Sequence, residues 1–166
     1  NLLAFKPNEN IASVISIADY SSLPHLVIAT KGGIIKKSPL VEYDSPRTGG
    51  LIAITLKDGD EVVAASAITS QDELLLISKK GMSLRFTADD ESLRPMGRSA
   101  TGVIGMKFRS GDELLTMSTI RNSDGKSENY VLTATDGGFG KRTNLYMLFI
   151  CCLFRVRMSF RRVLRE

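Results

Sequence analysis

Residues 26–37 read LVIATKGGIIKK, and residues 74–85 read LLLISKKGMSLR. Each stretch is an apolar run, then Thr or Ser, then a turn containing glycine and polar residues, then a second short run that ends in basic side chains. Residues 131–142 follow the same pattern as VLTATDGGFGKR. Short runs rich in Val, Ile, Leu and Thr on both sides of a glycine turn are typical of β-hairpins. The three stretches therefore predict one hairpin that recurs along the chain.

The hairpins recur at a spacing that indicates a repeat. Their turn glycines are 48 and 57 residues apart. A second element lies between them, because residues 50–63 read GLIAITLKDGDEVV and residues 102–115 read GVIGMKFRSGDELL. Each copy has two strand-like runs around a Gly-Asp turn. A repeat of about 50 residues with about four strands fits a propeller blade. One irregular β-barrel with chance similarity between its strands is the alternative.

The positive charge of the chain is concentrated at its C-terminal end. The formal net charge is +4, with 43% apolar and 24% charged residues. Residues 1–144 hold seventeen Lys or Arg and seventeen Asp or Glu, whereas residues 145–166 hold five arginines and one glutamate. Total charge is therefore weak evidence that residues 1–144 bind nucleic acid. The position of each charge has to be interpreted instead.

Several classes of protein and site are disfavoured by composition. The two cysteines are the adjacent pair Cys151 and Cys152, which argues against a disulfide framework or a C-x₂-C metal site and favours a reducing compartment. The lone His25 does not support a metal site or a catalytic triad. The longest apolar run, 145–154, is about half as long as a membrane-spanning helix. Because the chain begins at Asn1 without a signal-peptide pattern, we expect a cytoplasmic piece of a longer protein.

Three stretches carry a resemblance to a known family. Residues 1–5 read NLLAF, residues 29–54 read ATKGGIIKKSPLVEYDSPRTGGLIAI, and residues 93–106 read LRPMGRSATGVIGM. With these motifs, residues 1–144 closely resemble the C-terminal β-pinwheel domain of the DNA gyrase A family, of which the topoisomerase IV C-terminal domain is a close relative. The resemblance implies an all-β fold with propeller-like blades of about four antiparallel strands. Roughly three blades are expected here, whereas a complete domain of this type has about six.

The resemblance also implies a function. It implies a module that binds and wraps duplex DNA without sequence preference and so supports ATP-dependent negative supercoiling by a parent type II topoisomerase. The tyrosine nucleophile, ATP and Mg²⁺ of that enzyme belong to other domains, so we expect no catalysis, cofactor or metal in this chain. The implied partners are duplex DNA, the gyrase A N-terminal domain and gyrase B, without a membrane. A propeller-like protein-interaction module and a truncated fragment without function are the alternatives.

Basic residues recur at equivalent places in the repeats, and we predict that they contact DNA phosphates. Wrapping without sequence preference needs cations at intervals along a curved path. The candidates after the glycine turns are Lys36, Lys37, Arg85, Lys141 and Arg142. The candidates in the turns and following loops are Lys31, Lys79, Lys80, Arg47, Arg94 and Arg98. Acidic residues recur at the Gly-Asp turns, which predicts a basic rim and an acidic opposite edge. The alternative is that these Lys and Arg only protect strand edges and keep the surface soluble.

The C-terminal end departs from the family pattern. In the family, a wrapping box of the form Q-[RG]-R-G-G-K-G follows a K-R-T step such as residues 141–143, and residues 145–166 contain no such box. We interpret residues 145–166 as an anomalous tail produced by a frame shift or truncation; an interfacial helix and a basic arm on DNA are the alternatives. The nearest internal stand-in for the box is residues 45–50, SPRTGG, where Arg47 stands near two glycines. This loop has the ingredients of a phosphate contact, and a purely structural turn is the alternative.

Overall fold

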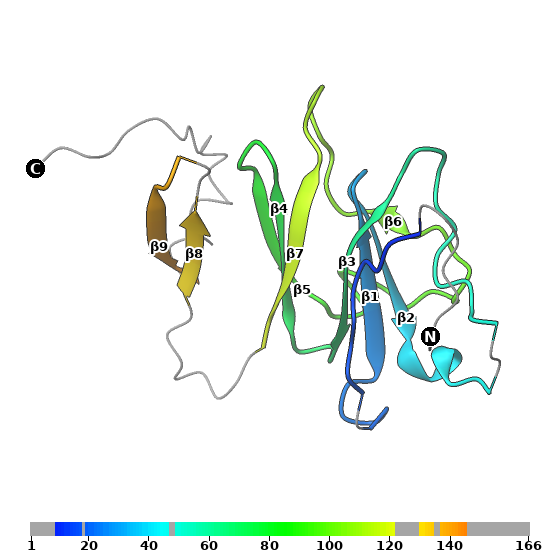
Figure 1. The fold of residues 1–166 in the computed structure, drawn as a ribbon. Coiled ribbons are helices and arrows are strands. Elements are labelled where there is room, and N and C mark those ends of the chain that lie inside the picture. Colours follow the sequence, from blue (N-terminus) through cyan, green and yellow to red (C-terminus); the bar gives the residue numbers. More distant parts are fainter. Residues whose placement is uncertain (1–8, 18, 47–48, 122–129, 135–136, 146–166) are drawn as a thin grey trace, which may run out of the picture.

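The computed structural model describes residues 9–17, 19–46, 49–121, 130–134 and 137–145, and these residues form three antiparallel sheets (Figure 1). The first sheet, in the order β3-β1-β2-β6, consists of β1 (His25–Thr30), β2 (Ile34–Pro39), β3 (Val62–Ile68) and β6 (Val103–Ile104). The second, in the order β5-β4-β7, consists of β4 (Glu73–Ser78), β5 (Ser83–Thr87) and β7 (Leu114–Ile120). The third pairs β8 (Tyr130–Ala134) with β9 (Gly140–Asn144), and the short 3-10 helix η1 (Leu40–Tyr43) follows β2. The predicted all-β fold is confirmed.

The three recurring stretches form the hairpins β1–β2, β4–β5 and β8–β9, as predicted. The glycines in their turns, Gly33, Gly81 and Gly138, have φ angles of 81°, 81° and 80°. This left-handed conformation is readily adopted by glycine and is costly for residues with a Cβ atom. The three hairpin turns therefore share one backbone conformation, which favours glycine at the same position of each repeat.

The first sheet takes its fourth strand from the following repeat. Strand β6 belongs by sequence to the second repeat, yet it pairs with β2, where Ile34 lies opposite Ile104 and Ile35 opposite Val103. The second sheet has three strands and the third has two among the described residues, compared with the expected number of about four. Local sequence patterns do not show this exchange, because a hairpin pattern does not specify which distant segment pairs with its outer edge.

The first two sheets pack against each other through the central strands β1 and β4. Val27 and Ala29 of β1 lie in one core cluster with Leu74 and Leu76 of β4. The alternate residues of the same two strands belong to two other clusters, on the outer faces of the two sheets. Because successive side chains of a strand point to opposite faces, a strand buried on both faces is apolar at nearly every position. This explains the unbroken apolar runs in the first two hairpins.

A Gly-Asp turn stabilises the hairpin turn of its own repeat. In the first repeat, the Thr30 hydroxyl donates to Asp60 Oδ2 at 2.7 Å and the Gly32 N–H donates to Asp60 Oδ1 at 2.8 Å. The backbone N–H of Lys31 donates to the Glu61 carbonyl oxygen at 2.8 Å. Burial favours a raised pKa for Asp60, but hydrogen bonds from Thr30, Gly32 and Glu61 hold its pKa below the ordinary value of 3.8.

The same contacts recur in the second repeat. The Lys80 N–H donates to Asp112 Oδ1 at 3.0 Å, and the Lys79 N–H donates to the Glu113 carbonyl oxygen at 2.9 Å. Burial favours a raised pKa for Asp112, but hydrogen bonds from Ser78, Lys80 and Glu113 outweigh it and lower that pKa. The aspartate that recurs after glycine therefore has a structural role in both repeats.

Replacing Asp60 with Ala is expected to lower the free energy of unfolding by about 2 kcal/mol, because the buried Thr30 hydroxyl and the Gly32 N–H lose a charged acceptor. Urea unfolding at neutral pH measures the change. Since the folded-state pKa of Asp60 is lowered, its contribution is present above pH ~4 and is lost as the pH falls through that folded pKa. Asp58→Ala, in the same turn but exposed, is the control and should change stability by less than about 0.5 kcal/mol. Equal losses in the two variants would contradict the structural role.

Candidate nucleic-acid interface

Lys36 lies in the middle of β2, and its side chain is fully buried. Its Nζ donates hydrogen bonds to the main-chain oxygens of Ala53, Gly97 and Arg98. Burial lowers the pKa of the Lys36 ammonium group. The prediction that Lys36 lies on an exposed basic rim is wrong, because β2 continues to Pro39 and the loops around residues 53 and 97 cover this lysine.

Lys37 and Arg85 occupy equivalent positions, four residues after their turn glycines, and both reach into the following repeat. Lys37 Nζ donates to the Ala88 carbonyl oxygen at 2.8 Å, and Arg85 Nη1 donates to the Leu145 carbonyl oxygen at 2.9 Å. The two acceptors are each seven residues after the next turn glycine. Arg85 also pairs with Glu73, and 16% of its side chain is exposed. Their predicted exposure on a basic rim is wrong, because these recurring basic side chains link neighbouring repeats.

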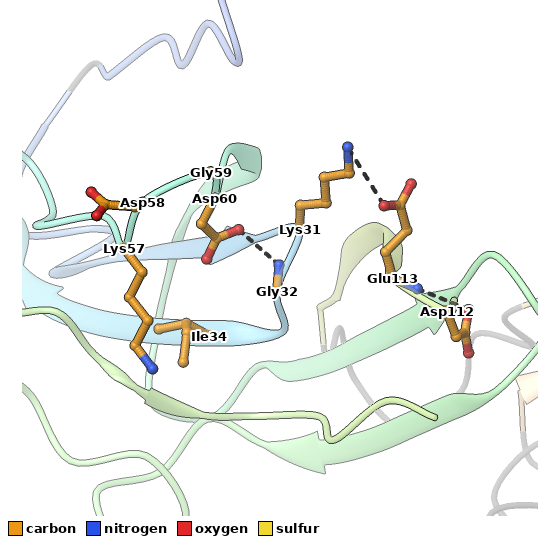
Figure 2. A pocket seen from close by; sticks show the side chains of 9 residues that line it. All are labelled: Lys31, Gly32, Ile34, Lys57, Asp58, Gly59, Asp60, Asp112 and Glu113. Carbon is orange, nitrogen blue, oxygen red and sulfur yellow. Dashed lines mark hydrogen bonds and ion pairs between the residues drawn. The ribbon is translucent and has the colours of Figure 1, made fainter. Parts of the chain in front are cut away.

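The hairpin turns and the Gly-Asp turns meet at one edge, where both signs of charge occur (Figure 2). Lys31 Nζ lies 3.5 Å from Glu113 Oε2 and 3.9 Å from Glu61 Oε2. Lys79 pairs with the same Glu113, and the hydrogen bond between them is the main reason that the pKa of this carboxyl group is lowered. A shallow pocket here is lined by Lys31, Gly32, Ile34, Lys57, Asp58, Gly59, Asp60, Asp112 and Glu113. The prediction that basic and acidic groups occupy opposite edges is therefore wrong at this edge.

Other predicted contact residues keep exposed surface. Lys80 is exposed and donates from Nζ to the Ser110 carbonyl oxygen at 3.1 Å. Arg98 is half-buried, and its Nη1 donates to the Ile52 carbonyl oxygen at 3.0 Å. Arg47 lies outside the described residues, as does most of the predicted tail at 145–166.

Lys141 and Arg142 are exposed on β9. The Arg142 guanidinium lies over the Tyr130 ring at 4.6 Å from its centroid, a cation–π contact that the sequence pattern did not predict. Arg142 pairs with Leu132 in the hairpin, so Tyr130 is its diagonal neighbour on the same face. This diagonal spacing across the hairpin is the sequence signal from which the contact could have been predicted.

Five of the predicted contact residues remain as the candidate contact set, namely Lys80, Arg94, Arg98, Lys141 and Arg142. Lys80 lies in the turn between β4 and β5, Arg94 and Arg98 lie in the loop after β5, and Lys141 and Arg142 lie on β9. Among the described residues, the ion pairs within 4.0 Å include none of these five. Their positive charges are therefore not neutralised by a direct carboxylate contact within the part of the chain that the structure describes.

The described residues contain no cluster of three or more His, Cys, Asp or Glu side chains arranged to hold a metal ion. Within the same residues, no helix is long and apolar enough to cross a membrane.

A protein-family model matches most of the described chain. A family model described as the DNA gyrase C-terminal domain, beta-propeller, matches residues 24–69, 72–121 and 129–149. The three matched segments each begin at or just before one of the recurring hairpins. The chain belongs to this gyrase C-terminal domain family. The resemblance drawn from the sequence motifs is thereby confirmed, as is the propeller-type fold.

Curated relatives and solved structures support membership of the gyrase C-terminal domain family. The chain is 55% identical to the DNA gyrase A protein of Streptomyces coelicolor over 150 residues and 50% identical to that of Mycolicibacterium smegmatis over 145 residues, covering 87% of this chain and 17% of each relative. The C-terminal domain of DNA topoisomerase IV superposes with a TM-score of 0.75 at 29% identity, covering 87% of this chain and 43% of that one. A DNA gyrase A C-terminal domain superposes with a TM-score of 0.71 at 27% identity, covering 87% and 46%. The chain thus spans less than a fifth of these curated relatives and less than half of the solved domains.

Proposed function

We propose that this chain is a DNA-binding and wrapping module of a gyrase A protein and contacts the backbone of duplex DNA without sequence preference. The observation that carries the proposal is the match of the gyrase C-terminal domain family to all three repeats. The candidate contact set supplies the chemistry, because guanidinium and ammonium groups donate to phosphate oxygens. Arg98, for example, has five N–H donors and uses one on Ile52.

The charge balance of the chain favours a small number of local phosphate contacts. Residues 1–144 carry equal numbers of basic and acidic residues, so attraction by net charge is absent there. Local groups of one sign still attract a phosphate backbone when the total charge cancels. The expected affinity therefore falls with rising salt, with a log–log slope of about −0.9 for each phosphate contacted.

In the whole protein, we propose that this module acts with the gyrase A N-terminal domain and gyrase B in ATP-dependent negative supercoiling. ATP and Mg²⁺ would act in those other domains, in the bacterial cytoplasm. The chain's part would be to hold and bend a DNA segment. The energy of bending is offset by the phosphate contacts that the bend permits.

Replacing Lys141 and Arg142 together with Gln is expected to weaken binding to duplexes of any sequence. The log–log slope of affinity against salt should become shallower by about 0.9 for each phosphate that is no longer bound, hence by about 1.8. Fluorescence anisotropy with two unrelated duplexes, across a salt series, measures both quantities. The control is Lys79→Gln, because that lysine is already paired with Glu113 and its replacement should change the slope little.

The same proteins test wrapping. Sealing nicked circular DNA in the presence of the unmodified protein should change the linking number of the product, and the double variant should produce a smaller change. Unaltered affinity and slope in the double variant would overturn the assignment of β9 to the interface. No binding of duplex DNA by the unmodified protein at moderate salt would overturn the proposed function and favour a protein-interaction module.

A further inference from the structure

The buried ammonium group of Lys36 is satisfied by main-chain carbonyls. Its three acceptors belong to two segments, since Ala53 follows the 45–50 loop while Gly97 and Arg98 belong to the RPMGR stretch. Lys36 takes part in no ion pair within 4.0 Å among the described residues. Burying an ammonium group without a carboxylate partner is costly, so its hydrogen bonds to the carbonyl oxygens are needed to offset the lost hydration.

The fold of the repeat does not require a charged side chain at this position. Lys36 lies three residues after its turn glycine, and the equivalent residue of the second hairpin is Leu84, which packs against the central core. The two hairpins have the same strand pairing, with Ile28 opposite Lys36 and Leu76 opposite Leu84. An apolar side chain is therefore compatible with the hairpin at this position, so the hairpin itself does not need the ammonium group of Lys36.

The loop held by Lys36 carries Arg98, whose backbone and side chain are both fixed. The Arg98 N–H donates to Glu42 Oε2 at 2.7 Å, and its carbonyl oxygen accepts from Lys36. Its Nη1 donates at 3.0 Å to the carbonyl of Ile52, which precedes the Ala53 carbonyl held by Lys36. Lys36 thus bonds to both partners of the contact between Arg98 and residue 52. It donates to the Arg98 carbonyl oxygen, and it donates to the Ala53 carbonyl oxygen next to the residue that accepts from the Arg98 side chain.

The beginning of the same loop is attached to the neighbouring lysine. Lys37 Nζ donates to the Ala88 carbonyl oxygen and lies 2.7 Å from Asp90 Oδ1, and the Lys37 carbonyl oxygen accepts from the Met96 N–H at 2.7 Å. Leu93, 1% exposed, anchors the middle of the loop in the central core. Lys36 and Glu42 hold the end of the loop at the backbone of Arg98 itself.

We propose that Lys36 is a positioning residue for DNA binding, which holds the loop of residues 94–98 against residues 52–53 so that the Arg98 guanidinium is set for a backbone phosphate. This inference rests on the proposed function. Lys36 does not touch DNA itself, because its ammonium group is buried. Lys36 contributes to DNA affinity by positioning Arg98, so this contribution is absent when Arg98 is replaced by a residue without a guanidinium group.

The test is a double-mutant cycle of Lys36→Met and Arg98→Gln, read as duplex affinity across a salt series. Lys36→Met should weaken binding about tenfold, the effect of losing one charge-assisted hydrogen bond. It should also make the salt slope shallower by about 0.9, as Arg98→Gln does. In the Arg98→Gln background, Lys36→Met should have no further effect on affinity or slope. A merely structural role would instead weaken binding equally in both backgrounds.

A folding control and a second variant distinguish failure of the positioning role from failure of the proposed interface. Thermal unfolding shows whether Lys36→Met is folded at the assay temperature. If it is not, Lys36→Gln replaces it: its amide has two N–H donors on a shorter side chain, so binding should weaken by less than tenfold, and this weakening should still vanish in the Arg98→Gln background. Unchanged affinity in the folded Lys36 variant, with weakened binding in Arg98→Gln, overturns the positioning role alone. Unchanged affinity in Arg98→Gln and in the Lys141 and Arg142 double variant overturns the proposed interface.

Discussion

Replacing Gly33 with Ala is expected to lower the free energy of unfolding by about 4 kcal/mol. A Cβ atom at this position would lie 2.3 Å from the main-chain oxygen of Met106 and 2.7 Å from Cε2 of Phe108. The Gly33 carbonyl oxygen also accepts hydrogen bonds from the Gly105 and Met106 N–H groups at 2.9 and 3.1 Å. The second repeat therefore lies directly on the first hairpin turn. The estimate combines about 1–2 kcal/mol for the left-handed backbone with about 1–3 kcal/mol for overpacking.

The matched control for this prediction is Gly59→Ala. Gly59 has a φ angle of 77°, close to the 81° of Gly33, but a Cβ atom there would meet nothing within 4 Å. The control should lose only the backbone cost of about 1–2 kcal/mol. Urea unfolding of both variants measures the difference, which reports the close approach of the two repeats. Equal losses would show that only the backbone conformation matters at Gly33.

Replacing Leu76 with Ala is expected to lower the free energy of unfolding by about 3–5 kcal/mol, at the upper end for a buried leucine. Leu76 is 0% exposed at the centre of β4, where it lies opposite Leu84 on one side and Met117 on the other. Its side chain belongs to the core between the first two sheets. A cavity there is enclosed by two sheets, so the surrounding chain has little freedom to collapse into it.

The same substitution on an exposed leucine provides the comparison. Leu115, on the neighbouring strand β7, is 51% exposed, so Leu115→Ala should cost less than about 1 kcal/mol. Chemical unfolding monitored by circular dichroism measures both variants. A loss at Leu76 no larger than that at Leu115 would contradict the placement of β4 between two packed sheets.

Several features of the fold are predictable because they depend on neighbouring residues. The apolar runs around a glycine specify hairpins, and the recurrence of Gly33, Gly81 and Gly138 specifies the repeat. The recurring Gly-Asp turns are also evident in the sequence, although the role of their aspartates in stabilising the hairpin turns is not. A carboxylate that accepts from a backbone N–H across 28 residues, as Asp60 does from Gly32, is not visible in a local pattern.

The predicted exposure is wrong for three of the contact residues, and the basic pair after Gly33 illustrates the physical reason. The sequence pattern places Lys36 and Lys37 at the end of a strand, where charges are usually solvated. Strand β2 continues to Pro39, and residues 53, 88, 97 and 98 supply the carbonyl groups that surround the two ammonium groups. Two signs of burial are present in the sequence, the apolar pair directly before the lysines and the leucine in place of Lys36 in the second hairpin.

Local patterns specify the β-hairpins, their turns and the repeat, because these depend on side-chain periodicity and on glycine at left-handed positions. They also supply the motifs of the gyrase C-terminal domain family. Long-range packing sets which basic residues face water. Lys37 and Arg85 are held by the carbonyls of Ala88 and Leu145, in the repeats that follow them, whereas Arg142 extends over an aromatic ring at the surface. A recurring position in the sequence therefore has different exposures in different repeats, because burial depends on the segment that packs against it.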